Sequence, residues 1–238
     1  MSSQNNKSIM DGIRCLQEIS KQNTPVGCRD LARTLGLDPA RVNRLLMTFE
    51  EEGILIKTSK KKYLPGPGIY VLSAQCLHHS SLMNQVFRAI ESLPEKKYTL
   101  AFGFLWQTYI TYLFHGVPGS GLTRGMNRTS AYYALDSSIG QILLANKSES
   151  ELEETFGKSE LKKFSFTEEY KNNMLAKKYC TLIREDKKPN IYSIATIIEN
   201  YPFAGVAITN VEVSVKEADV VDELFQIKNT IEAFLRTN

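Results

Sequence analysis

Two short helices joined by a tight turn constrain the fold of this chain more than any other feature of its sequence. The stretch CRDLARTLG (28–36) predicts a helix that ends at Gly36, because glycine tolerates the left-handed conformation common at helix ends. Asp38 can cap the next helix, and Pro39 suits its first position because no N–H is needed there. Two helices connected so closely through a glycine predict a helix-turn-helix.

The second helix, within LDPARVNRLLMTFEEEG (37–53), has one apolar and one polar face. Its apolar residues follow the spacing i, i+3, i+4 and i+7, which predicts a single buried stripe. They are Val42, Leu45, Leu46 and Phe49. We expect the N-terminal turns of the helix to present Ala40, Arg41, Asn43, Arg44 and Thr48 outward. Arginine can bridge two acceptors of guanine and asparagine can bridge adenine, so this face is typical of a DNA recognition helix.

A short hairpin follows directly. Residues 54–56 and 63–64 read as strands around a polar turn at 58–62, and a hairpin in this place predicts a winged helix. Lys60, Lys61 and Lys62 lie at its tip, where we expect them to meet phosphates and add affinity without sequence choice. An earlier helix completes the domain, with a predicted buried stripe of Ile9, Ile13, Leu16 and Ile19.

The basic charge of the chain is concentrated in this N-terminal part. Residues 1–70 hold eleven Lys and Arg against seven Asp and Glu, a balance of +4, whereas the remainder holds 18 and 19, a balance of −1. A positive local field favours a polyanion such as double-stranded DNA. The alternative is a sensor or scaffold whose winged helix binds protein, with a solvated amphipathic helix and a charged hairpin.

The PGPG segment (65–68) is the clearest break in the chain. We therefore expect a winged-helix domain at 1–68, linker helices at 69–93 and a ligand-sensing domain at 94–238. From about Tyr98 the pattern predicts strands interrupted by helices, which indicates an α+β domain built on a mostly antiparallel sheet. The expected strands are 98–106, 108–116, 180–185, 191–199 and 203–213, and the expected helices are 134–146, 148–157, 167–179 and 216–236.

The sequence offers little for enzyme chemistry. The loop GVPGSG (116–121) has the spacing of a phosphate-binding loop, but Leu122 stands where the lysine is needed. His78 and His79 are neighbours on a helix and point in different directions, so they are a poor metal pair. We expect no catalytic residue, no metal and no cofactor. The scattered cysteines, the polar start and the lack of a long apolar run predict a cytoplasmic protein with no membrane partner.

Three stretches, in this order, resemble the IclR family of bacterial transcription regulators. They are the helix-turn-helix with its wing and Gly-Pro break, the segment ALDSSIGQILLAN (134–146) with SESELEETF after it, and the paired strands YSIATII and PFAGVAITNVEV. Gly140 matches a Gly-Lys pair of the family, but Gln141 stands where lysine is typical. The resemblance implies a dimer or tetramer that binds a partly palindromic DNA operator. A small organic effector would modulate its DNA affinity.

The resemblance also implies where the effector binds. Matched residue by residue, the contacts are the helix start at Ser138 and Ile139 and the strand positions Ile183, Ser193, Ala207 and Thr209. Two of these positions lack the polar group of the family, and unpaired carboxylate oxygens are costly in apolar surroundings. We therefore expect an apolar or aromatic effector, or a site with no ligand role, in which the strand hydroxyls are satisfied locally.

The polar face of the second helix and the wing predict two different roles on DNA, base contacts for the helix and phosphate contacts for the wing. Replacing Arg44 with Ala is expected to cost about 1–3 kcal/mol on the preferred DNA site and to relax base preference, because a base contact is lost. Replacing Lys61 with Ala is expected to weaken binding to all sequences about equally. Titrations of both variants on specific and random duplexes measure this. Equal, sequence-blind losses from both would contradict a base-reading role for Arg44.

Overall fold

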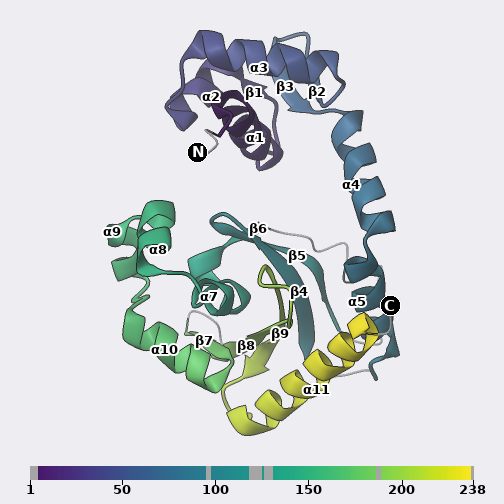
Figure 1. Cartoon of the computed structure of the whole chain (residues 1–238), viewed down its shortest axis with the longest axis vertical. Coiled ribbons are helices and arrows are strands. Elements are labelled where there is room, and N and C mark those ends of the chain that lie inside the picture. Colours follow the sequence, from purple (N-terminus) through teal and green to yellow (C-terminus); the bar gives the residue numbers. More distant parts are fainter. Residues whose placement is uncertain (1–4, 95–97, 118–124, 126–130, 186–188, 237–238) are drawn as a thin grey trace. The chain divides into compact units, whose positions relative to one another are not determined.

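The computed structural model describes residues 5–94, 98–117, 125, 131–185 and 189–236, in two compact units (Figure 1). The units comprise residues 1–80 and 81–238, so the boundary along the chain falls between Ser80 and Ser81. That point lies inside the segment expected to link the two domains, so the domain bounds of the sequence analysis stay a prediction. None of the described helices is long and apolar enough to cross a membrane.

The first unit is a winged helix. In chain order it contains α1 (Lys7–Ser20), β1 (Val26–Gly27), α2 (Cys28–Leu35), α3 (Pro39–Glu51), β2 (Leu55–Lys57) and β3 (Lys62–Pro65). The three strands form an antiparallel sheet in the order β1-β3-β2. Gly36 ends α2 with a φ of 64°, and the side chain of Asp38 caps α3 by accepting a hydrogen bond from Arg41 N at 2.9 Å. Both features match the signals in the sequence.

The core of this unit confirms the apolar face of α3 but corrects that of α1. Val42 and Leu46 are fully buried, as predicted. Ile19 of α1 is buried, as predicted. Ile9 and Ile13, however, are 61% and 41% exposed, and α1 buries Asp11, Gly12 and Cys15, which were not predicted. Gly12 explains the difference, because a Cβ there would lie only 3.0 Å from Phe49 Cζ. The glycine lets α1 and α3 approach closely on a side that apolar spacing does not reveal.

Two helices follow the wing. α4 (Pro67–His79) buries none of its residues within the unit, although its sequence is largely apolar. α5 (Ser81–Ser92) belongs to the second unit, where Met83, Val86 and Ile90 are buried in the same core cluster as Leu224 and Ile231 of α11 (Glu217–Arg236).

The second unit is built on a six-stranded sheet in which every neighbouring pair is antiparallel. Its order is β6-β5-β4-β9-β8-β7. The bounds are β4 Thr99–Trp106, β5 Tyr109–Gly116, β6 Ala131–Tyr133, β7 Cys180–Arg184, β8 Ile191–Ile197 and β9 Ala204–Glu212. The prediction of an α+β protein with a winged helix and a mostly antiparallel sheet is confirmed.

Helices cover both faces of this sheet (Figure 1). α5 and α11 pack on one face, over a core that includes Val206 and Ile208 of β9. The other face is covered by α7 (Ser138–Leu144), which follows the short 3₁₀ turn η1 (Ala134–Asp136). Further helices of this unit, among the residues that the structure describes, are α8 (Glu149–Phe156), α9 (Lys158–Lys163) and α10 (Glu168–Lys177). Small residues on neighbouring strands, Ala101, Ala195 and Ala207, are fully buried in the core of the α7 face and leave room for the helix.

Gly140 allows α7 to pack against η1. A Cβ at this position would lie 2.1 Å from the carbonyl oxygen of Ala134, which is backbone and cannot move aside cheaply. Replacing Gly140 with Ala is therefore expected to lower the free energy of unfolding by about 3 kcal/mol. Urea denaturation followed through the fluorescence of Trp106, the single tryptophan of the chain, reports on this unit.

The control for this prediction is Ile142→Val in the same helix. Ile142 is 1% exposed, and the loss of one buried methylene is expected to cost about 1 kcal/mol. A Gly140→Ala variant no less stable than the Ile142→Val variant would refute the steric explanation.

Candidate functional site

The polar face of α3 is exposed as the sequence predicts, with one exception. Asn43, Arg44 and Thr48 are exposed in the first and middle turns of the helix, opposite the buried Val42 and Leu46. Asn43 Nδ2 lies 3.4 Å from Met47 Sδ, and the hydroxyl of Thr48 donates to the carbonyl of Arg44 at 3.1 Å. The guanidinium of Arg44 has no ion-pair partner among the described residues.

The exception is Arg41, which does not point outward. Its guanidinium Nη2 lies 2.8 Å from Oδ2 of Asp11 on α1, and the two side chains are 26% and 5% exposed. A buried carboxylate is costly unless a cation lies beside it, and the guanidinium of Arg41 is the cation beside Asp11. The predicted outward direction of Arg41 is therefore wrong, and the reason lies in a residue of another helix.

The wing presents its lysines as expected. Lys60 and Lys61 are exposed in the turn between β2 and β3, and Lys62 is exposed at the start of β3. The turn is closed by Thr58, whose backbone carbonyl accepts from Lys61 N at 2.9 Å and whose hydroxyl accepts from Lys62 N at 3.2 Å. Lys61 adopts a φ of 56°, a conformation that sharpens the tip. Together these residues place three cations on one exposed hairpin.

The second unit brings most of the predicted effector residues to the α7 face of the sheet. Ser138 and Ile139 are buried at the start of α7, and Ala207 lies in the same core. Ser193 and Thr209 lie two residues along their strands from Ala195 and Ala207, so they share this face. Ile183 does not join them. Cys180, three residues earlier in β7, faces α7, so alternation turns Ile183 to the opposite face, where it is 55% exposed.

Several polar residues that the sequence analysis did not select gather on this same face. Tyr112 of β5 shares a hydrogen bond of 3.0 Å with the hydroxyl of Ser137, and its ring lies 4.9 Å from that of Tyr132. His115 Nε2 lies 3.4 Å from Thr209 Oγ1, which in turn donates to the carbonyl of Thr99 at 3.3 Å. Burial raises the pKa of Tyr112, so its hydroxyl remains a donor at neutral pH.

A strand irregularity explains why Tyr112 and His115 meet. Their side chains are three residues apart, which in a regular strand would place them on opposite faces. The register of β5 against β4 shifts at Phe102/Gly103, so that Tyr112 pairs with Gly103 and His115 with Ala101. The rings of Tyr112 and His115 lie 5.5 Å apart as a result. Simple alternation gives no signal for such a bulge.

An arginine at the end of β7 reaches the same region. Arg184 Nη1 lies 2.9 Å from Oδ1 of Asp136, and its Nη2 donates to the backbone carbonyl of Asp136 at 2.7 Å. Asp136 ends η1, immediately before the Ser137 that pairs with Tyr112. Arg184 therefore fixes the edge strand to the segment that leads into α7.

The position where lysine is typical of the family lies inside the core. Gln141 is 3% exposed, and its Nε2 donates to the carbonyl of Leu135 at 2.7 Å. Its Oε1 accepts from the hydroxyl of Tyr170 at 2.8 Å and from the thiol of Cys180 at 3.4 Å. Burial raises the pKa of Cys180 to about 12, so this thiol stays neutral. A neutral amide satisfies its neighbours here without burying a charge.

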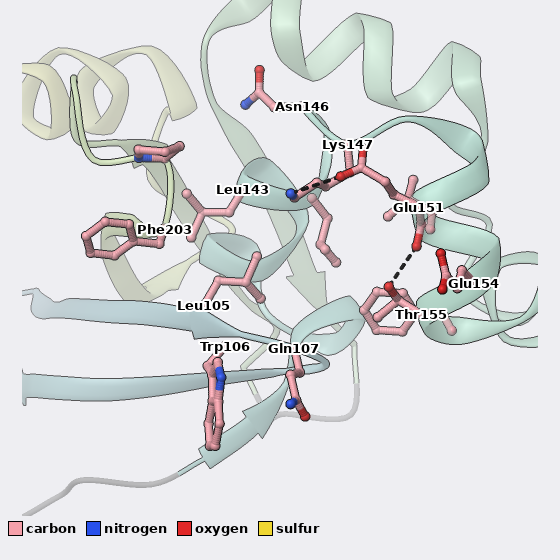
Figure 2. A pocket seen from close by; sticks show the side chains of 14 residues that line it. Leu105, Trp106, Gln107, Leu143, Asn146, Lys147, Glu151, Glu154, Thr155 and Phe203 are labelled. Atoms are coloured by element: carbon pink, nitrogen blue, oxygen red, sulfur yellow. Dashed lines mark hydrogen bonds and ion pairs between the residues drawn. The ribbon is translucent and has the colours of Figure 1, made fainter. Parts of the chain in front are cut away.

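A hollow of about 530 Å³ lies near the other end of α7 (Figure 2). Figure 2 places Trp106 at the end of β4 and Gln107 of the β4–β5 turn on one side, Glu151 and Thr155 of α8 on another, and Phe203 on a third. Its floor is apolar, and Lys147 Nζ lies 3.2 Å from Glu151 Oε1 at its rim. None of the predicted effector residues lines this hollow.

The features considered for enzyme chemistry gain no support. The described residues contain no cluster of three or more His, Cys, Asp or Glu side chains arranged to hold a metal. His78 and His79 lie on α4 with ring centroids 4.9 Å apart, edge to face. Residues 118–124 of the glycine-containing loop lie outside the described residues.

Comparisons with known proteins agree with this architecture. Residues 12–58 match the family model of the IclR helix-turn-helix domain. No curated protein matches the chain. Among solved structures, the chain is similar in fold to an IclR family transcriptional regulator from Brucella abortus, with a TM-score of 0.75, 18% identity, and 98% of this chain and 94% of that chain covered.

Two further structures share the fold. An IclR transcriptional regulator from Alicyclobacillus acidocaldarius has a TM-score of 0.67 and 15% identity, with 97% and 99% of the chains covered. An IclR homologue from Microbacterium hydrocarbonoxydans, complexed with 4-hydroxybenzoate, has a TM-score of 0.60 and 16% identity, with 98% and 100% covered. The present chain therefore carries an IclR helix-turn-helix domain and has, over nearly its whole length, the fold of the IclR family of transcription regulators.

Proposed function

We propose that the protein is a DNA-binding transcription regulator whose recognition helix, residues 39–52, enters the major groove. One observation carries this proposal: α3 buries Val42 and Leu46 and leaves Asn43, Arg44 and Thr48 exposed on its opposite face. These side chain types hydrogen-bond base edges. The exposed lysines of the wing, Lys60 to Lys62, supply phosphate contacts.

The regulator works as a homo-oligomer. α4 exposes Tyr70, Val71 and Leu72 by 66%, 53% and 53%, and α1 exposes Ile9 by 61% and Met10 by 50%. Exposed apolar surface of this kind marks an interaction site. A second copy of the chain, paired about a two-fold axis, would cover it and present two recognition helices to one duplex.

The effector is a small aromatic molecule that binds on the α7 face of the sheet. Tyr112, Tyr132 and His115 supply aromatic surface there, while the hydroxyls of Ser137 and Thr209 supply hydrogen bonds. The 4-hydroxybenzoate complex of the Microbacterium protein supports an aromatic ligand in this fold. The protein would have one arrangement that binds DNA and one that does not. The effector changes DNA affinity only to the extent that it binds one of these arrangements more tightly than the other.

The alternative is a scaffold whose winged helix binds protein. The salt dependence of DNA affinity distinguishes it from a DNA-binding regulator. We expect the full-length protein to select a defined sequence from a library of random duplexes. Its affinity for that sequence should fall steeply with salt, because each neutralised phosphate contributes about −0.9 to the slope of log K against log salt. A slope near zero, or no selected sequence, would contradict DNA binding and favour the alternative.

The effector site has its own test, with 4-hydroxybenzoate as the first probe. Replacing Tyr112 with Phe removes one hydroxyl and is expected to weaken binding of the probe by up to about tenfold in calorimetry, because a hydrogen-bond donor is lost. The matched control is Tyr192→Phe, which removes a partly buried hydroxyl from the opposite face of the sheet. Equal losses in the two variants would argue against a site beside Tyr112.

A further inference from the structure

A buried carboxylate lies where the three helices of the winged helix meet. Asp11 of α1 is 3% exposed, and its Oδ2 lies 2.8 Å from Nη2 of Arg41 near the start of α3. Its Oδ1 lies 3.6 Å from Nη1 of Arg14. Arg14 Nη2 donates to the carbonyl of Leu35, the last residue of α2, at 3.2 Å. Asp11 thus connects α1 to α3 directly and to the end of α2 through Arg14.

The Asp11–Arg41 ion pair is buried, unlike the Asp30–Arg33 ion pair of the same domain. Arg33 and Asp30 also lie 2.8 Å apart, but their side chains are 81% and 59% exposed. Exposed pairs contribute little to structure, whereas a buried carboxylate demands its partner in one place. The side chain of Asp11 is only 5% exposed, so Arg41 rather than solvent compensates its charge. Because Arg41 lies near the start of α3, the ion pair ties that end of the helix to α1.

The geometry of α3 makes this anchor relevant to DNA. Asn43 follows Arg41 by two residues, which is about 200° around a helix, so the two side chains point in nearly opposite directions. Arg41 faces α1, and Asn43 faces solvent. A rotation of α3 that relaxed Arg41 would move Asn43 and Arg44 by the same angle. Hydrogen bonds to base edges tolerate little such movement.

We propose that Asp11 and Arg41 are positioning residues for base reading. Their ion pair sets the angle at which α3 presents Asn43 and Arg44, and Arg41 itself contacts no base. The inference rests on the proposed DNA-binding function and replaces the direct role that the sequence alone suggests for Arg41.

A double-mutant cycle in the full-length protein tests this inference. The variants are Asp11→Asn, Arg41→Gln and the combination of both, with Asp30→Asn as the matched control on the exposed pair. The readout is the ratio of affinities for the selected sequence and for random duplex at fixed salt. Each single change is expected to lower the ratio by about tenfold or more, and the combination by no more than the worse single change. The control should keep the ratio within about twofold.

Losses that add in the double variant, or a loss with Arg41→Gln alone, would overturn the inference because Arg41 would then contact bases itself. Arg41→Lys keeps a cation beside Asp11 and is expected to retain more of the ratio than Arg41→Gln. The comparison of Arg41→Lys, Arg41→Gln and the wild type also tests the inference if Asp11→Asn fails to fold. An affinity ratio of Arg41→Lys as low as that of Arg41→Gln would overturn the inference. A wild-type protein that selects no sequence overturns the proposed function as well, whereas an unchanged ratio in folded Asp11→Asn overturns this inference alone.

Discussion

The burial of one side of α3 is the constraint on which the rest of the account depends. Val42 and Leu46 are fully buried in the small core of the winged helix, and Gly12 lets α1 lie close to Phe49 of the same helix. Because a helix is rigid, fixing one side fixes what the other side presents. The polar residues Asn43 and Arg44 are therefore held on a defined exposed surface, as recognition of a rigid duplex requires.

The second unit applies the same principle to a different surface. Small residues such as Ala207 allow α7 to lie close to the sheet, and Gly140 allows it to pack against η1. The side chains at the edge of this contact, Tyr112 and Thr209 among them, are then held by hydrogen bonds to neighbouring segments. A ligand that competes for these hydrogen bonds would change how the segment before α7 sits on the sheet. That is the physical basis on which we expect an effector to act.

Local signals predict the winged helix well, and contacts between distant segments explain what they miss. Gly36, Asp38 and the apolar spacing of α3 are each readable within a few residues, and each behaves as expected. The direction of Arg41 depends on Asp11, thirty positions earlier, and no periodicity within α3 contains that information. In the sheet, the shift beside Gly103 brings His115 to the face of Tyr112. The two-residue strand β1 was likewise too short for a pattern to indicate.

Photocrosslinking from the exposed face of α3 tests the central claim most directly. Met47 is 52% exposed and lies beside Asn43, so a photoreactive amino acid at position 47 should sit close to the bases. Our account predicts crosslinks to bases of the selected duplex from position 47, and none from position 9 on α1. A protein that binds this duplex tightly but forms crosslinks from position 9 and none from position 47 would contradict the account.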